Sequence, residues 1–317
     1  MIDNFLIVAL QVAILFVLMG FGAAMRRAGL FRENAIDGIV NVLILVVTPC
    51  LVVDVFQRPF DPSMLKGLGC AFALAALVHV IMIVLSGLVL RHRDENVRRP
   101  LRLAAVFSNA GFMGVPLEQA VLGDVGVFYG IVYVVVFNLF MWSWGLRTMC
   151  AEGTWEGGGG KGPMNLKMWI NPGTVGIALG LPLFFLSVKL PAVIGVPIHH
   201  MANLNTPLAM IVIGYALAGA KFGKVLRTGA VYVATVLRLV VCPLLAVLAL
   251  YPFRRMLDRN MMLAMAVAAS APVAAMVSMF AAKYRRDVDV SVTIVSGTTL
   301  LSILTMPVDI ALAMAVL

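Results

Sequence analysis

Charged residues are scarce in this sequence, since Asp, Glu, Lys and Arg make up only 12% of its 317 residues. Soluble domains contain about 25% charged residues, because most of their surface must be hydrated. Hydrophobic residues reach 62%, and the mean hydropathy is +1.01. This composition excludes a soluble enzyme, a nucleic-acid-binding module and a disordered protein. It predicts a membrane protein with several spanning segments.

Cysteine and catalytic motifs are scarce as well. The four cysteines are scattered and form no closely spaced ligand pair, which argues against a disulfide framework and against a zinc site. The sequence also lacks H-E-x-x-H, G-x-x-x-x-G-K-[ST] and G-x-S-x-G. We therefore expect no enzymatic activity, no cofactor and no bound metal. The N-terminus lacks the basic region and cleavage site of a signal peptide, so its apolar run is expected to remain as a helix.

Long apolar segments occupy most of the chain. A helix needs about 20 apolar residues to cross a bilayer, and the alternation typical of barrel strands is absent. We therefore predict an all-α polytopic membrane protein with ten transmembrane helices. The ten predicted segments are 4–25, 34–57, 64–91, 100–120, 125–147, 169–188, 198–220, 225–251, 259–282 and 288–315.

Basic residues gather in alternate loops of this ten-helix arrangement. Of the 24 Lys and Arg residues, 17 lie in loops on one side. Loops rich in Lys and Arg stay in the cytoplasm, so the net charge of +9 indicates topology and not nucleic-acid binding. Both termini are then expected on the non-cytoplasmic side of the cell (inner) membrane.

The two halves of the chain share features at a constant spacing. Gly22 and Gly180 are 158 residues apart, and Pro116 and Pro272 are 156 apart. Five spans per half is an odd number, so the halves would have opposite orientations, as in transporters with inverted repeats. The predicted organisation is a first five-helix repeat at 1–150, a cytoplasmic Gly-rich linker at 151–168 and a second repeat at 169–317.

Two of the predicted helices are interrupted near the middle of the membrane. One contains Asn109, Ala110, Gly111, Gly114 and Pro116, and the other contains Ala269-Ser270-Ala271-Pro272 at the matching place. Unwound backbone at this depth is tolerated only beside protein or a water-filled cavity, and the freed helix N-termini attract anions. The paired interruptions therefore favour a binding site for a small anion, and ordinary proline kinks are the alternative.

Several polar residues lie inside the predicted spans. A charge at the bilayer centre costs at least about 2.5–3.5 kcal/mol, so Arg238 must either attract the anion or donate hydrogen bonds to carbonyl groups. His79 and Glu118 are candidate proton-coupling groups. The alternatives are a packed histidine and an acid that reaches the membrane interface. Asn138 and Thr206 either bind a carboxylate or link helices.

Five motifs resemble those of the auxin efflux carrier family, which includes plant PIN-type carriers and bacterial carriers of malonate and malate. Residues 109–117 are similar to its N-x-x-x-M-G-x-P-L crossover segment. Residues 171–174 are similar to its N-P-N-T element, and residues 208–214 to its A-M-x-x-x-G stretch. Residues 269–272 and 281–284 resemble its second crossover and the end of that helix.

This resemblance implies a homodimer in the lipid bilayer. Helices 1, 2, 6 and 7 would form a scaffold, and the other helices a domain that moves substrate by an elevator motion. Substrate would bind beside the crossing of helices 4 and 9. Its carboxylate would contact Asn109 and the segment formed by Ser270, Ala271, Pro272 and Val273, and Pro116 and Pro272 would fix the breaks.

The sequence therefore predicts a secondary transporter of small organic anions, mono- or dicarboxylates such as malonate or malate. No acid lies at the membrane centre to ligate a cation, so a proton or the membrane potential is favoured over sodium. A sodium-coupled symporter of related fold and a non-transporting membrane sensor are the alternatives.

Overall fold

The computed structural model describes residues 2–31, 33–150, 172–220 and 228–317. Helices make up nearly all of this part of the chain, and it contains no β-strand, only a single isolated bridge. The α-helices are α1 (Ile2–Arg27), α2 (Glu33–Val42), α3 (Thr48–Phe56), α4 (Pro62–Val89), α5 (Glu95–Val106), α6 (Val115–Phe140), α7 (Leu146–Met149), α8 (Pro172–Phe185), α9 (Ala192–Asn203), α10 (Asn205–Ala218), α11 (Gly229–Val236), α12 (Cys242–Leu250), α13 (Arg259–Ser270), α14 (Met276–Lys283) and α15 (Val288–Val316). The predicted linker at 151–168, the motif residue Asn171 and the basic loop at 221–227 lie outside the described residues.

Seven helical runs in the described part are long and apolar enough to cross a membrane, which confirms the all-helical, multi-pass prediction. The longest run is Ala110–Met149, with 40 residues. Gly123 interrupts it with φ 67° and ψ −159°, a conformation open mainly to glycine, so this run consists of two helices joined at a bend. The predicted segment 259–282 is likewise divided, into α13 and α14.

Three short π-helical turns precede prolines that lie inside helices. They are η1 (Leu43–Val47), η2 (Ala110–Gly114) and η6 (Leu237–Val241), and each ends two residues before a proline. A proline in a regular helix has no N–H to donate and clashes with the carbonyl four residues earlier. A π turn widens the helix and lengthens that spacing, which lets the helix continue through Pro116 and its counterparts.

Glycines bring the backbones of two helix pairs into contact. A Cβ on Gly22 of α1 would lie 2.1 Å from the Ile211 carbonyl oxygen of α10. A Cβ on Gly214 would lie 1.8 Å from the Met19 carbonyl oxygen in the reverse direction. On α8, Gly180 lies against Phe56 of α3 in a similar way. Small residues allow this close helix packing in membranes.

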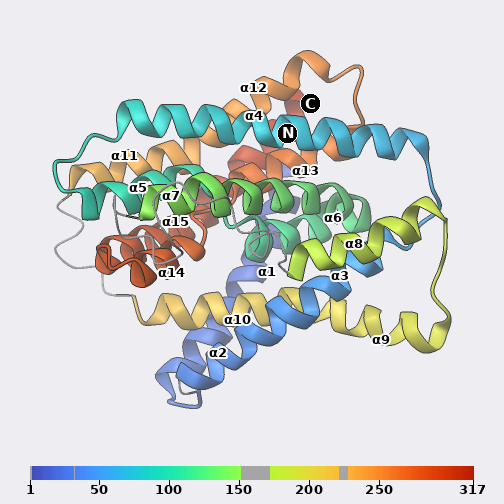
Figure 1. The fold of residues 1–317 in the computed structure, drawn as a ribbon, viewed down its shortest axis with the longest axis horizontal. Helices are drawn as coiled ribbons and strands as arrows, with labels where there is room; N and C mark the ends of the chain where they lie inside the picture. Colours follow the sequence, from blue (N-terminus) through green and yellow to red (C-terminus); the bar gives the residue numbers. More distant parts are fainter. Residues whose placement is uncertain (1, 32, 151–171, 221–227) are drawn as a thin grey trace, which may run out of the picture.

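The buried hydrophobic side chains form two main clusters, to both of which α6, α13 and α15 contribute. Figure 1 shows α2, α3, α9 and α10 along its lower side, with α4, α11 and α12 along its upper side and α5, α6 and α13 between. The larger core connects α4, α5, α6 and α11–α15. A second core joins α1, η1 and α10 to the residues of η2 and α13. The interrupted segments lie where these two cores meet.

Candidate functional site

The two predicted interruptions meet and pair through their backbones. α5 ends at Val106 and η2 starts at Ala110, so three non-helical residues lie between them. The Asn109 N–H donates a 2.7 Å hydrogen bond to the Pro272 carbonyl oxygen. The Ala274 N–H donates a 3.0 Å hydrogen bond to the carbonyl of Phe107. This crossing pairs backbone groups that the breaks would otherwise leave unpaired inside a membrane.

The middle of the crossing is an antiparallel bridge between Ser108 and Val273. The Val273 N–H donates a 3.2 Å hydrogen bond to Thr298 Oγ1, so α15 also holds this segment. Sequence reasoning missed Thr298 because a hydroxyl in a membrane helix usually bonds its own backbone, as it does here to Ile294. The sequence feature that could have identified Thr298 is a pair of threonines in the middle of an apolar helix.

Pro272 and Pro116 play different roles, which corrects one expectation. Pro272 follows Ala271, whose φ of −61° and ψ of 147° are the extended values imposed on a residue before proline. Pro116 lies in the first turn of α6, after the break at 107–109. The preceding turn η2 accommodates Pro116, so this proline does not fix the break.

One side of the crossing is partly open. Gly111 and Phe112 at the start of η2 are half-buried, as are Ala275 and Met276 at the start of α14, whereas the crossing itself is buried. A Cβ built on Gly111 would meet no atom within 4 Å. Helix starts carry unpaired N–H groups and a positive dipole end. Two such starts therefore face the region beside the crossing.

Asn109 lies next to this open region. It is the N-cap of η2, with 6% of its surface exposed, and its side chain makes no capping hydrogen bond. No hydrogen bond in the described part of the chain uses its side-chain amide. The residue keeps a small exposed surface and its amide has no partner in this part of the chain, so the amide is available to a ligand.

Arg238 holds both interrupted helices at their C-terminal ends. Its side chain is fully buried, and one terminal nitrogen donates a 2.9 Å hydrogen bond to the carbonyl of Val106, the last residue of α5. The other donates to the carbonyl of Ala269 in the last turn of α13 and to Cys242 Sγ at 3.0 Å. Cations stabilise the negative ends of helices. Of the two predicted roles, the structure shows hydrogen bonding to carbonyl groups.

Buried polar groups gather behind the crossing. Among the described residues, Ser108 Oγ, Tyr133 OH and His79 Nε2 lack a hydrogen-bond partner of good geometry. His79 Nδ1 lies 2.8 Å from the Ala75 carbonyl, and its ring stacks on Phe140 with 5.4 Å between centroids. His79 is therefore the packed histidine of the two alternatives, with one ring nitrogen still free.

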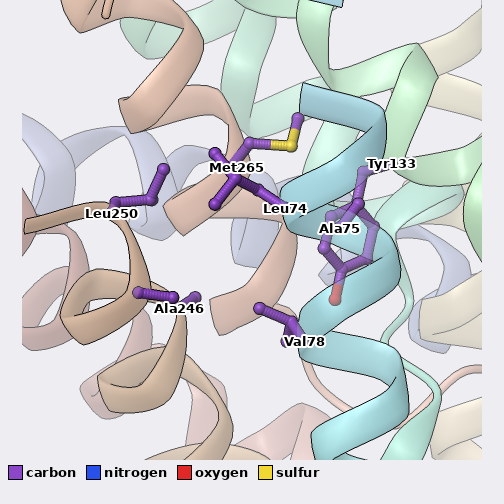
Figure 2. A pocket seen from close by; sticks show the side chains of 8 residues that line it. Leu74, Ala75, Val78, Tyr133, Ala246, Leu250 and Met265 are labelled. Carbon is purple, nitrogen blue, oxygen red and sulfur yellow. The ribbon is translucent and has the colours of Figure 1, made fainter. Parts of the chain in front are cut away.

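A small cavity lies beside this group, between α4, α6, α12 and α13. Its volume is about 10 Å³, which is at the lower limit for a single water molecule. Figure 2 shows Tyr133 among apolar side chains that include Val78 and Met265. A carboxylate does not fit this cavity, so we place no substrate there.

Asn138 and Thr206, two of the remaining predicted residues, make no hydrogen bond to the crossing within the described residues. The Asn138 amide donates to the Val134 carbonyl at 2.8 Å within its own helix, and Ser270 Oγ donates to Val267 at 2.8 Å in the same way. Thr206 is half-buried in the first turn of α10. No hydrogen bond of the described residues links Asn138 or Thr206 to the two interruptions. Gly114 lies near α13, since a Cβ there would be 3.5 Å from Ala268 Cα, an ordinary contact distance.

Glu118 is enclosed by the protein and does not reach the protein surface. Its side chain has no exposed surface, and neither carboxyl oxygen has a hydrogen-bond partner in the described part. A Cβ built on Gly130 would lie 1.7 Å from Glu118 Oε2. The carboxyl group is therefore packed directly on the glycine backbone of the second helix of α6.

Comparison with known proteins covers almost the whole chain. A family model described as membrane transport protein matches residues 7–156 and residues 162–310. The two matched ranges include both interrupted segments. A search of curated proteins finds no match.

Proposed function

Because the chain belongs to the family of membrane transport proteins that includes the auxin efflux carriers, we propose that it is a secondary transporter of small organic anions. The substrates in this proposal are mono- or dicarboxylates such as malonate or malate. Membership of the family makes the protein a membrane transporter and is consistent with the absence of enzymatic activity. The substrate class and the mechanism are our inference from the crossing.

The observation that carries the proposal is the backbone pairing of Asn109 with Pro272. This pairing brings two partly exposed helix starts, η2 and α14, to the crossing, next to an amide without a partner in the described part of the chain. Arg238 meanwhile neutralises the two helix ends on the opposite side of each break. In this proposal the crossing offers N–H donors and positive dipole ends to a carboxylate, while Arg238 offsets the negative ends of α5 and α13.

In this proposal the carboxylate contacts the Asn109 amide and the backbone at the start of η2, where Gly111 leaves open space. Ala110 and Gly114 shape the η2 side, and Ala271 and Val273 shape the other. Thr206 would supply a hydroxyl from α10 when the site faces the scaffold. Asn138 would contribute only after its bond to Val134 opens.

Helix packing supports an inverted repeat of ten helices. The contact of α1 with α10 and the contact of α3 with α8 are equivalent when the two halves are exchanged. Gly22 and Gly180 provide the close approach in one contact each. We propose that repeats at 1–150 and 169–317 form a homodimeric elevator in the cell membrane, with both termini on the non-cytoplasmic side. Helices of the larger core would move along α1, α3, α8 and α10.

Flux into liposomes tests the proposal. Purified protein is reconstituted, and uptake of labelled malonate, malate and a panel of other carboxylates is measured. At least one carboxylate should be taken up, and Asn109→Ala should abolish that uptake while the protein remains folded. Asn203→Ala, an exposed amide on α9, is the matched control and should retain uptake. Undiminished flux in Asn109→Ala would contradict the site.

Two alternatives have distinct outcomes in the same assay. Uptake that is lost when choline replaces sodium in the buffer would indicate a sodium-coupled symporter. Carboxylates that raise the melting temperature but never cross the membrane would indicate a sensor. Uptake without sodium supports the proposal.

A further inference from the structure

The carboxyl group of Glu118 is buried between the two helices of α6. Gly123 bends α6, so that the helix after the bend packs against the helix before it. A Cβ on Gly126 would lie 2.4 Å from Leu122 Cβ, and one on Gly130 would lie 1.7 Å from Glu118 Oε2. The two glycines are four residues apart and lie on one helix face. Gly130 leaves the space that the Glu118 carboxyl group occupies, and Gly126 leaves space for Leu122 and the backbone carbonyl of Glu118.

This environment is incompatible with an ionised carboxylate. Both oxygens of Glu118 are buried and lack hydrogen-bond partners among the described residues. An unpaired buried charge is far more costly than an unpaired neutral group, and a buried acid relieves the cost by binding a proton.

No charged group compensates for the burial of Glu118. The elements packed against α6 are α1, α3, α4, α8 and α13 together with η2 and the π turn η3 (Met141–Gly145). None of the described titratable groups on α6 and these elements makes a hydrogen bond or an ion pair with Glu118: Arg26, Arg27, Cys50, Asp54, Lys66, Cys70, His79, Asp124, Tyr129, Tyr133 and Arg259.

Exposed polar residues nevertheless lie close to Glu118 along the chain. Gln119, the next residue, is exposed, and its Nε2 donates a 2.9 Å hydrogen bond to Oδ1 of exposed Asp124. A small separation of the two helices at the Gly123 bend would therefore hydrate the Glu118 carboxyl group.

We infer that Glu118 is a proton-binding site of the transporter. Its carboxylate takes up one proton from water at the α6 bend, forming a neutral acid, and the two helices of α6 pack as observed only with this proton bound. Transport through this conformation then requires the proton, and the rate of transport rises as the pH falls. This inference rests on the proposed transport function and adds the binding of one proton to the transport cycle.

Uptake in liposomes at different pH values tests this inference. Labelled malonate, or the carboxylate that the panel identifies, is used with the membrane potential held at zero by valinomycin and equal potassium concentrations. Wild-type uptake should increase on acidification by up to about tenfold per pH unit, the limit for one titrating group. Glu118→Gln is permanently neutral and should transport at a rate that lacks this dependence. Asp124→Asn, which removes an exposed acid near the bend, should retain the wild-type profile.

The difference between variants isolates Glu118, because every variant is exposed to the same ionisation of the substrate. If Glu118→Gln keeps the wild-type pH profile, the inference is wrong while the transport function stands. A wild-type transport rate that does not vary with pH would also show that the inference about Glu118 is wrong. If no carboxylate is transported or bound by any variant, the proposed function itself fails.

Infrared difference spectroscopy decides on the proton without any transport. A protonated carboxyl group has its own C=O stretching band, distinct from that of a carboxylate. At neutral pH this band should be present in the wild-type spectrum and lost in Glu118→Gln. Identical spectra for the two proteins would overturn the inference even if both proteins transport.

Discussion

The guanidinium of Arg238 donates a 2.9 Å hydrogen bond to the carbonyl oxygen of Val106, at the last residue of α5. The same side chain donates to Ala269 near the end of α13. A single buried cation thus joins the C-terminal ends of both interrupted helices. The crossing of Asn109 with Pro272 begins a few residues further along each chain segment. The position of the candidate site therefore depends on a residue that lies behind it.

Removal of this cation should destabilise the protein before it affects substrate recognition. Arg238→Gln leaves two buried carbonyl groups without a charged donor, and each such hydrogen bond contributes about 1.5–3 kcal/mol. Arg238→Lys keeps the charge but lacks the planar fork that reaches two acceptors, so it should be intermediate. Thermal unfolding in detergent measures the loss. Arg255→Gln, at an exposed position, serves as the control. An unchanged melting temperature with weakened anion affinity would mean that Arg238 acts on the substrate directly.

Space at Gly111 should matter for transport and not for folding. Because a Cβ there meets no atom within 4 Å, Gly111→Ala should leave the melting temperature unchanged or raise it slightly, since alanine favours helix by about 1 kcal/mol. The added methyl group should nevertheless raise the KM for the carboxylate, and Gly111→Leu should block uptake. Gly69→Ala on α4 is an equally open position remote from the crossing and should change neither quantity. Normal KM values in both Gly111 variants would place the substrate elsewhere.

The sequence allowed the helical, multi-pass architecture and the two interruptions to be predicted, because hydropathy, glycine and proline act locally. Hydropathy windows could not separate the roles of Pro116 and Pro272, since only the π turn η2 lets a helix pass through Pro116. The partners of Arg238 were equally inaccessible, because the Val106 carbonyl is 132 residues away in sequence. The burial of Glu118 depends on the bend at Gly123, whose positive φ no local pattern specifies.

The contact of α1 with α10 should be sensitive to a single methyl group. A Cβ on Gly22 would lie 2.1 Å from the Ile211 carbonyl oxygen, which is backbone and cannot rotate away. Gly22→Ala should therefore force the helices apart and lower the free energy of unfolding by about 1–3 kcal/mol. Gly20→Ala, two residues earlier on α1, adds its methyl group to open space and should have no such cost. Equal melting temperatures for the two variants would contradict this packing.

The packing of Glu118 on Gly130 predicts a coupling between the two residues. A methyl group at position 130 would overlap the carboxyl group, since the distance from that Cβ to Glu118 Oε2 would be 1.7 Å. Gly130→Ala should therefore destabilise the protein by about 1–3 kcal/mol, the range for an overpacked site. Glu118→Ala removes the overlapping group, so the double variant should be more stable than the two single losses would predict. A double-mutant cycle of unfolding free energies measures this interaction, which contacts of this kind make as large as about 0.5–3 kcal/mol. Additive losses would show that the carboxyl group does not occupy the space over Gly130, and the dry environment inferred for its proton would then be lost as well.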